Sequence, residues 1–173
     1  VLSAMRRSID GKQTRALVEK MRKAVPGIAL RTTMMVGHPG EGQNEFEDLL
    51  SFVNEYKIER LGAFAYSEEE GTWGAKNLQD IVPEEVKQQR LEELMELQSY
   101  ISLNFNEGRI GTKERVLVDS YDDERGLLVG RTSKEAPEVD GEVLIDPRSL
   151  SDPRSLIGTF ADVEIVGADE YDL

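Results

Sequence analysis

The chain has 173 residues, enough for one medium-sized domain or two small ones, and its 39% apolar residues are sufficient for a core. With 34 acidic and 21 basic residues its net charge is −13, which argues against non-specific nucleic-acid binding, because such binding needs clustered positive charge. Cysteine is absent, which excludes disulfides and thiolate-ligated metals within the chain. The single histidine cannot build a zinc site alone.

The first part of the chain is predicted to begin with a helix and a strand. Residues 1–7 resemble the tail of an interrupted element, and Asp10 is a possible N-cap. Apolar residues at spacings of three and four then predict an amphipathic helix over about 12–24. Residues 28–36 are almost all apolar or β-branched, which predicts a strand buried on both faces, as in parallel sheets.

A second helix and strand are expected to follow. The helix covers about 44–56, and residues 60–66 predict a strand parallel to the first, so that the three elements form one βαβ unit. Residues 67–80 have no periodicity and are predicted to be a loop, at the same sheet edge as the turn at 37–42. A long helix then starts near Pro83.

After Thr112 the apolar period changes from 3.6 to 2. Four short runs, 115–120, 126–132, 142–146 and 159–166, predict a small antiparallel barrel. The pentapeptide Asp-Pro-Arg-Ser-Leu occurs twice, from Asp146 to Leu150 and from Asp152 to Leu156, and is interpreted as a surface loop without an assigned function.

The expected fold class is therefore α/β followed by all-β, with a boundary at residues 111 and 112. Residues 1–111 contain 14 basic and 18 acidic side chains (net −4), and residues 112–173 contain 7 and 16 (net −9). The second domain is thus the acidic one. No apolar run long enough for a membrane helix and no signal peptide are visible, so a cytoplasmic protein is the default expectation. The chain opens without an initiator methionine, and we expect that it begins inside a larger protein.

Several segments resemble one enzyme family. The run from Arg31 to Glu41, which contains Val-Gly-His-Pro-Gly-Glu, resembles the Val-Gly-Phe-Pro-Gly-Glu segment of the radical S-adenosylmethionine methylthiotransferases, with His38 in place of the usual Phe. Residues 1–7, 64–72 and 82–98 resemble further segments of the same family, in the same order. The C-terminal part resembles the TRAM domain. The resemblance covers nearly the whole chain and implies the last part of a (β/α) barrel, a linking helix and a small β-barrel.

Two segments narrow the resemblance to one branch of the family. Residues 136–141 read Ala-Pro-Glu-Val-Asp-Gly, and they and residues 167–173 resemble the RimO-type branch, which modifies the β-carbon of an aspartate in a small-subunit ribosomal protein. Two alternatives stay open. The tRNA-modifying branch shares the Val-Gly-x-Pro-Gly-Glu segment but typically has a more basic TRAM domain, and a non-enzymatic chain would use the βαβ scaffold and the small barrel only for binding.

The resemblance implies S-adenosylmethionine and two [4Fe–4S] clusters as cofactors of the full-length enzyme. The cysteines that hold the clusters in this family have no counterpart in this chain. We therefore expect the chain to be inactive alone, and no catalytic residue is assigned in it.

Candidate cofactor-binding residues lie at the carboxyl end of the first strand, where α/β folds place ligands. Thr33 and Met35 alternate onto one strand face, which we expect to face the barrel interior, although both residues also suit ordinary barrel filling. Gly37 would let the backbone approach the adenine, or it only supplies turn geometry. His38 is a candidate for proton transfer or a replacement for the Phe, and Arg6 and Arg7 are candidate carboxylate ligands or solvated surface residues.

Candidate partner-binding residues lie in the acidic domain. A basic ribosomal protein suits its charge better than RNA does. The residues assigned to this contact are Ala136, Pro137, Glu138, Asp140, Gly141 and Tyr171; the 136–141 segment is alternatively a plain turn.

Overall fold

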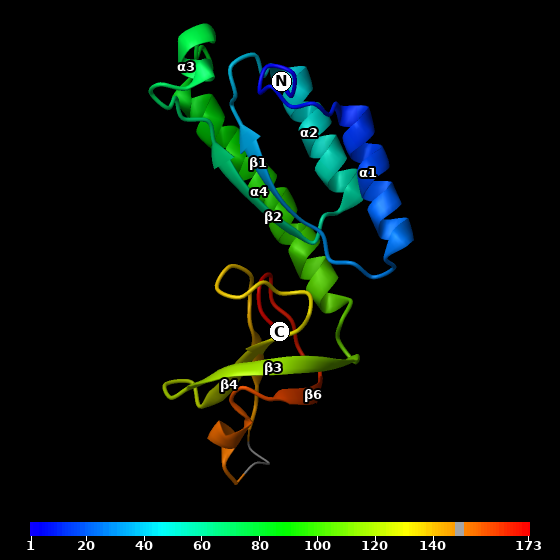
Figure 1. Cartoon of the computed structure of the whole chain (residues 1–173). Coiled ribbons are helices and arrows are strands. Elements are labelled where there is room, and N and C mark those ends of the chain that lie inside the picture. The colour runs from blue at the N-terminus through cyan, green and yellow to red at the C-terminus, as the bar shows by residue number, and fades with distance from the viewer. Residues whose placement is uncertain (148–150) are drawn as a thin grey trace. The chain divides into compact units, whose positions relative to one another are not determined.

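A computed structural model describes residues 1–147 and 151–173, and it contains two compact units, Val1–Ile101 and Ser102–Leu173. Figure 1 shows helices and a parallel strand pair in the first unit and an antiparallel sheet in the second. This arrangement confirms the predicted order of an α/β part, a long helix and a small antiparallel β part. Among the described residues, no helix is both long and apolar enough to cross a membrane.

The first unit is built from two strands and their flanking helices. Strands β1 (Arg31–Val36) and β2 (Arg60–Ala65) pair in parallel, with Arg31 opposite Arg60 and Val36 opposite Ala65. The helices are α1 (Gly11–Ala24), α2 (Gln43–Tyr56), α3 (Trp73–Asn77) and α4 (Glu84–Glu107), the last of which ends in the second unit.

One apolar core joins both strands to helices α1, α2 and α4. Phe46 and Val53 of α2 and Leu94 of α4 are almost completely buried in it, as the apolar spacing of these helices predicts. Met21, Met34 and Met95 pack against the same core.

The strand pair buries only one of its faces in this chain. Met34 and Val36 face the helices, whereas Thr33, which precedes Met34 and lies on the opposite face, is exposed. On β2, Gly62 and Phe64 are exposed in the same way, Phe64 to 46%. The prediction of burial on both faces is therefore wrong for this chain, because the described helices of the first unit supply a core to one face alone.

The predicted N-cap at Asp10 correctly marks the start of α1, whereas α3 was not predicted from the sequence. The Asp10 carboxylate accepts the N–H of Gln13, whose side chain in turn accepts the N–H of Asp10, a complete capping box. The predicted loop at 67–80 contains the five-residue helix α3, capped by the Thr72 hydroxyl, which accepts the N–H of Ala75. A helix of barely more than one turn is too short to show an apolar period, so the loop prediction was wrong there.

The second unit is a four-stranded antiparallel sheet in the order β5-β4-β3-β6. Its strands are β3 (Lys113–Asp122), β4 (Leu127–Arg131), β5 (Val143–Ile145) and β6 (Phe160–Glu164). The β3–β4 register shifts between Val118 and Ser120, so that one extra residue stands on β3. Such a bulge bends a strand and increases its twist, which accounts for the curl of the sheet.

The duplicated pentapeptide is only partly a loop. In its second copy, Pro153–Leu156 forms a 3₁₀ helix, because a proline at the first position has its φ preset for a helical turn. The first copy includes residues 148–150, which lie outside the described residues.

Candidate functional site

The turn after β1 is held by a buried carboxylate. Glu41 Oε1 accepts the N–H of Gly37 at 2.7 Å and a guanidinium N–H of Arg90 on α4 at 2.8 Å. Both side chains of this ion pair are buried, with 4% of Glu41 and 9% of Arg90 exposed. The Glu41–Arg90 pair therefore fixes the loop at the carboxyl end of β1 to the long helix.

Gly37 is needed for two reasons. Its φ of +74° lies in the left-handed region, and a Cβ there would lie 2.4 Å from Cγ of Lys87. Lys87 is 4% exposed, and its ammonium donates to Asp80 at 2.5 Å, a hydrogen bond that raises the pKa of Lys87 despite its burial. The turn geometry and the close approach of Lys87 therefore both explain this glycine.

His38 is buried beside the ring of Tyr66. Its Nδ1 lies 2.8 Å from the carbonyl oxygen of Pro39, which makes Nδ1 the protonated, donating nitrogen. The ring meets that of Tyr66 edge-on, with centroids 5.3 Å apart, and the Lys87 ammonium lies 5.4 Å from the centre of the Tyr66 ring. Burial raises the pKa of the Tyr66 hydroxyl. The buried His38 ring therefore packs against its neighbours, as a phenylalanine at this position would. It also forms part of the wall of a hollow.

This hollow, which we call the strand-end hollow, has a volume of about 450 Å³. It combines apolar, aromatic and cationic side chains from segments that are distant in the sequence. Its lining includes Arg6, Arg7, Met35, His38, Tyr66 and Trp73. Of the predicted cofactor-binding residues, Met35 lines it, Thr33 lies on the same strand face, and Gly37 lies in the turn next to His38.

The cofactors implied by the family can be tested against these residues. No cysteine is present anywhere in the chain, and no cluster of metal-ligating side chains occurs among the described residues, so an iron–sulfur cluster has no ligands here. The side chains that line the strand-end hollow are of types that suit S-adenosylmethionine. Met35 and the aromatic rings that line the hollow suit an adenine. Thr33 lies on the same strand face as Met35 but does not itself line the hollow.

In the second unit the predicted partner loop is joined to the C-terminal residues. A Cβ on Gly141 would lie 1.8 Å from the carbonyl oxygen of Tyr171, so only glycine fits this contact. The N–H of Glu142 donates to Asp172, and the N–H of Leu173 donates to the carbonyl of Glu142 at 2.9 Å. We call the combined surface of residues 136–142 and 169–173 the loop–tail surface.

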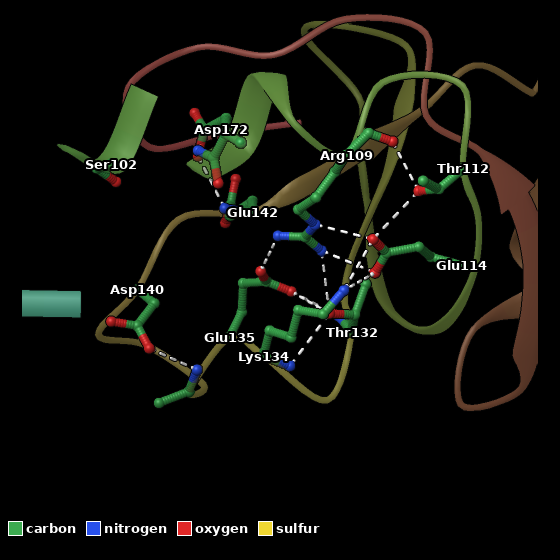
Figure 2. A network of polar contacts seen from close by, with 12 residues as sticks. Ser102, Arg109, Thr112, Glu114, Thr132, Lys134, Glu135, Asp140, Glu142 and Asp172 are labelled. Carbon is green, nitrogen blue, oxygen red and sulfur yellow. Dashed lines mark hydrogen bonds and ion pairs between the residues drawn. The ribbon is translucent and has the colours of Figure 1, made fainter. Parts of the chain in front are cut away.

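The loop–tail surface is acidic, with two exposed apolar side chains. Val139 is 61% and Tyr171 is 57% exposed. The acidic residues of the two segments are Glu138, Asp140, Glu142, Asp169, Glu170 and Asp172, and neither segment contains a basic residue. Asp140 also closes its own loop, since its carboxylate accepts the N–H of Ala136 at 2.7 Å (Figure 2). Of the other predicted residues, Pro137 and Glu138 are exposed.

The second unit also contains a buried ionic network that was not predicted from the sequence. Figure 2 shows Arg109 between Glu114 and Glu135, which it reaches at 2.9 Å and 2.5 Å. Lys134 also donates to Glu114, and the Thr132 hydroxyl donates to Glu135. Burial raises the pKa of Glu114, but the hydrogen bonds from Arg109 and Lys134 outweigh it and hold the pKa at about 2.

Only the three-dimensional fold brings these five side chains together. Residues 109 and 135 are 26 positions apart, so no sequence period connects them. The weak signal that was available is the isolated arginine immediately after the long helix, between Gly108 and Gly111.

Comparison with known proteins gives the chain its relatives. The family model of the TRAM domain matches residues 110–173. Over all 173 residues the chain is 50% identical to the ribosomal protein uS12 methylthiotransferase RimO of Porphyromonas gingivalis (strain ATCC 33277) and 47% identical to that of Bacteroides fragilis (strain ATCC 25285), and it covers 39% of each. It is 45% identical to the protein of the same name from Cytophaga hutchinsonii, of which it covers 38%.

The chain therefore spans about two fifths of the length of these relatives. Its whole length takes part in the similarity, including the turn after β1, the long helix and the TRAM domain. Over its whole length, the chain is thus similar to part of the ribosomal protein uS12 methylthiotransferases, and its residues 110–173 match the TRAM domain.

Proposed function

We propose that the chain is part of an enzyme that replaces a hydrogen on the β-carbon of an aspartate in ribosomal protein uS12 by a methylthio group. The observation that carries this proposal is the 50% identity across all 173 residues to a protein named as a ribosomal protein uS12 methylthiotransferase. The similarity includes the acidic second unit. A tRNA-modifying enzyme would be expected to have a more basic domain there.

In this proposal residues 1–111 form part of a (β/α) barrel with its linking helix, and residues 112–173 form the TRAM domain. The exposed face of β1 and β2 is then an inner wall, with Thr33, Met35 and Gly37 beside the cofactor. Cluster-bound S-adenosylmethionine supplies the hydrogen-abstracting radical in enzymes of this kind. The residues of this chain hold, orient and shield the reactants, and the cluster ligands must come from outside it.

A chimaeric enzyme tests this function directly. The corresponding two fifths of the Porphyromonas gingivalis protein are replaced by this chain, and uS12 is analysed by mass spectrometry after reaction. We expect a methylthio group on an aspartate of uS12. A folded, cluster-loaded chimaera that modifies tRNA instead would support the alternative branch, and one that modifies neither would leave a binding module as the function.

The partner of the TRAM domain is proposed from charge. Residues 112–173 have 7 basic and 16 acidic side chains, a net charge of −9, and the two segments of the loop–tail surface have no basic residue. Ribosomal proteins are typically basic, so opposite charges would speed their encounter with this domain, whereas phosphate would be repelled. Exposed Val139 and Tyr171 would then supply the short-range contacts that set the residence time.

Reversing one charge on the loop–tail surface should weaken this docking. Glu138→Lys is expected to raise the Kd for Porphyromonas gingivalis uS12 on the order of tenfold, because a contact between opposite charges becomes repulsive. The measurement is a calorimetric titration of the full chain at two ionic strengths. Weaker binding at the higher ionic strength is expected for the unaltered chain.

Glu124→Lys is the matched control, since it makes the same change in net charge in the exposed turn between β3 and β4. It should raise the Kd by only a small factor through long-range steering. Equal losses from the two variants would show that net charge alone acts, and tighter binding of the unaltered chain to tRNA would contradict a protein partner.

A further inference from the structure

The strand-end hollow contains a pair of cations that the proposed cofactor contacts leave unused. Arg6 and Arg7 both line it, and neither forms an ion pair within the part of the chain that the structure describes. Acidic residues outnumber basic ones by 34 to 21 in this chain, and other exposed arginines, such as Arg125 and Arg154, have carboxylate partners.

The backbone also holds Arg6 in a restricted conformation. Its φ is +58°, in the left-handed region that non-glycine residues rarely occupy. Backbone N–H groups of Met5, Arg6 and Arg7 donate to carbonyls three to five residues earlier and fix this turn. Unfavourable backbone conformations of this kind cluster at ligand-binding sites, where they fix a side chain for its task.

The Arg6 side chain is placed against an aromatic ring of the hollow. Its guanidinium carbon lies 5.6 Å from the centre of the Trp73 ring, within cation–π distance. Trp73 is the first residue of α3, whose cap at Thr72 is in turn fixed by the carbonyl of Glu69. A cation–π contact leaves the N–H groups of a guanidinium, which lie in the plane of the guanidinium itself, available for hydrogen bonds.

The positive charge of the residues that line the hollow favours an anionic ligand. Arg6 and Arg7 contribute two positive charges and Glu69 one negative charge, while the rest of the lining is neutral or apolar when His38 is neutral. The wall therefore has a net charge of about +1 inside a chain of −13. A planar guanidinium matches a carboxylate in two parallel hydrogen bonds, and the hollow beside Met35 accepts an attached aliphatic or aromatic group.

We infer that Arg6 and Arg7 form a carboxylate-binding subsite of the strand-end hollow, with Trp73 as its aromatic support. The proposed function offers two sources for this carboxylate: the side chain of the aspartate substrate and the amino-acid end of S-adenosylmethionine. Both share the same chemistry, and the inference concerns the subsite rather than the reaction.

Trp73 is the only tryptophan of the chain, so its fluorescence reports on this subsite directly. The full chain is titrated with S-adenosylhomocysteine and with 5′-methylthioadenosine, which has the same nucleoside and thioether but no carboxylate. It is also titrated with N-acetyl-aspartate amide and with N-acetyl-asparagine amide. We expect at least one acid to bind about tenfold more tightly than its uncharged partner, and the pair that differs identifies the source.

Arg7→Gln should remove most of that difference, and Arg154→Gln, which deletes the same charge in the other unit, should leave it unchanged. Because Arg7→Gln leaves the Arg6–Trp73 pair in place, the fluorescence signal remains available. Equal affinity for each acid and its uncharged partner in the unaltered chain would overturn the subsite, whatever the variants do. An active chimaera without carboxylate selectivity would refute this inference alone, and selectivity with an inactive chimaera would refute the proposed function alone.

Discussion

Replacing Arg109 by methionine is expected to lower the free energy of unfolding of the second unit by about 3–5 kcal/mol. The substitution keeps an unbranched side chain of similar length but leaves two carboxylates without their main partner. Only 2% of the Glu135 side chain and 10% of that of Glu114 are exposed, so water replaces little of what is lost. Lys134 still reaches Glu114, and the Thr132 hydroxyl still reaches Glu135.

Hydrogen exchange of the β3 and β4 amides, followed by NMR, measures this change in the full chain. Arg154→Met is the control, because Arg154 and its partner Asp123 are 59% and 70% exposed, and exposed pairs contribute at most about 1 kcal/mol. A loss below about 1 kcal/mol for Arg109→Met would show that the buried network stabilises the domain no more than a surface pair does.

The same network predicts how the stability of the domain depends on pH. Burial raises the pKa of Glu135, but hydrogen bonds from Arg109 and Thr132 outweigh it and lower this pKa, while the pKa of Glu114 falls to about 2 from an ordinary value of 4.5. Lowered pKa values stabilise the folded state fully above the unfolded-state values, and this contribution is lost as the pH falls from about 4.5 toward 2. The difference between the unaltered chain and Arg109→Met should therefore be largest near pH 7 and shrink on acidification.

Replacing Arg90 by leucine should destabilise the first unit by a similar amount, about 3–5 kcal/mol. It leaves the buried carboxylate of Glu41 without its ion pair, although the N–H of Gly37 still donates to it. The turn after β1 would then loosen, and with it the position of His38 in the wall of the strand-end hollow. Protection of the amides of β1 and α2 against hydrogen exchange measures the loss.

The double variant Glu41→Gln with Arg90→Leu separates charge from shape. A glutamine oxygen still accepts the N–H of Gly37, but no buried charge remains, so we expect most of the lost stability to return. If the double variant is as unstable as Arg90→Leu alone, the arginine acts through packing, for example against the ring of Phe46 at 5.3 Å, and not through its charge.

The sequence by itself determined the elements whose residues interact locally. Apolar spacing located α1, α2 and α4, and Asp10 marked the first of them, because helix faces and caps depend on residues three or four positions apart. The change of period near Thr112 located the antiparallel sheet. The lack of cysteine also determined, without any structure, that no thiolate-held cluster forms within this chain.

Only the tertiary structure decided which polar side chains are buried together. Arg109 and Glu135, or Glu41 and Arg90, are 26 and 49 positions apart, and charged residues in a sequence are by default expected at the surface. The same holds for the strand-end hollow, where Arg6, His38 and Trp73 meet from three separate segments. Burial and pairing of charges depend on long-range packing, which composition and the period of apolar residues do not encode.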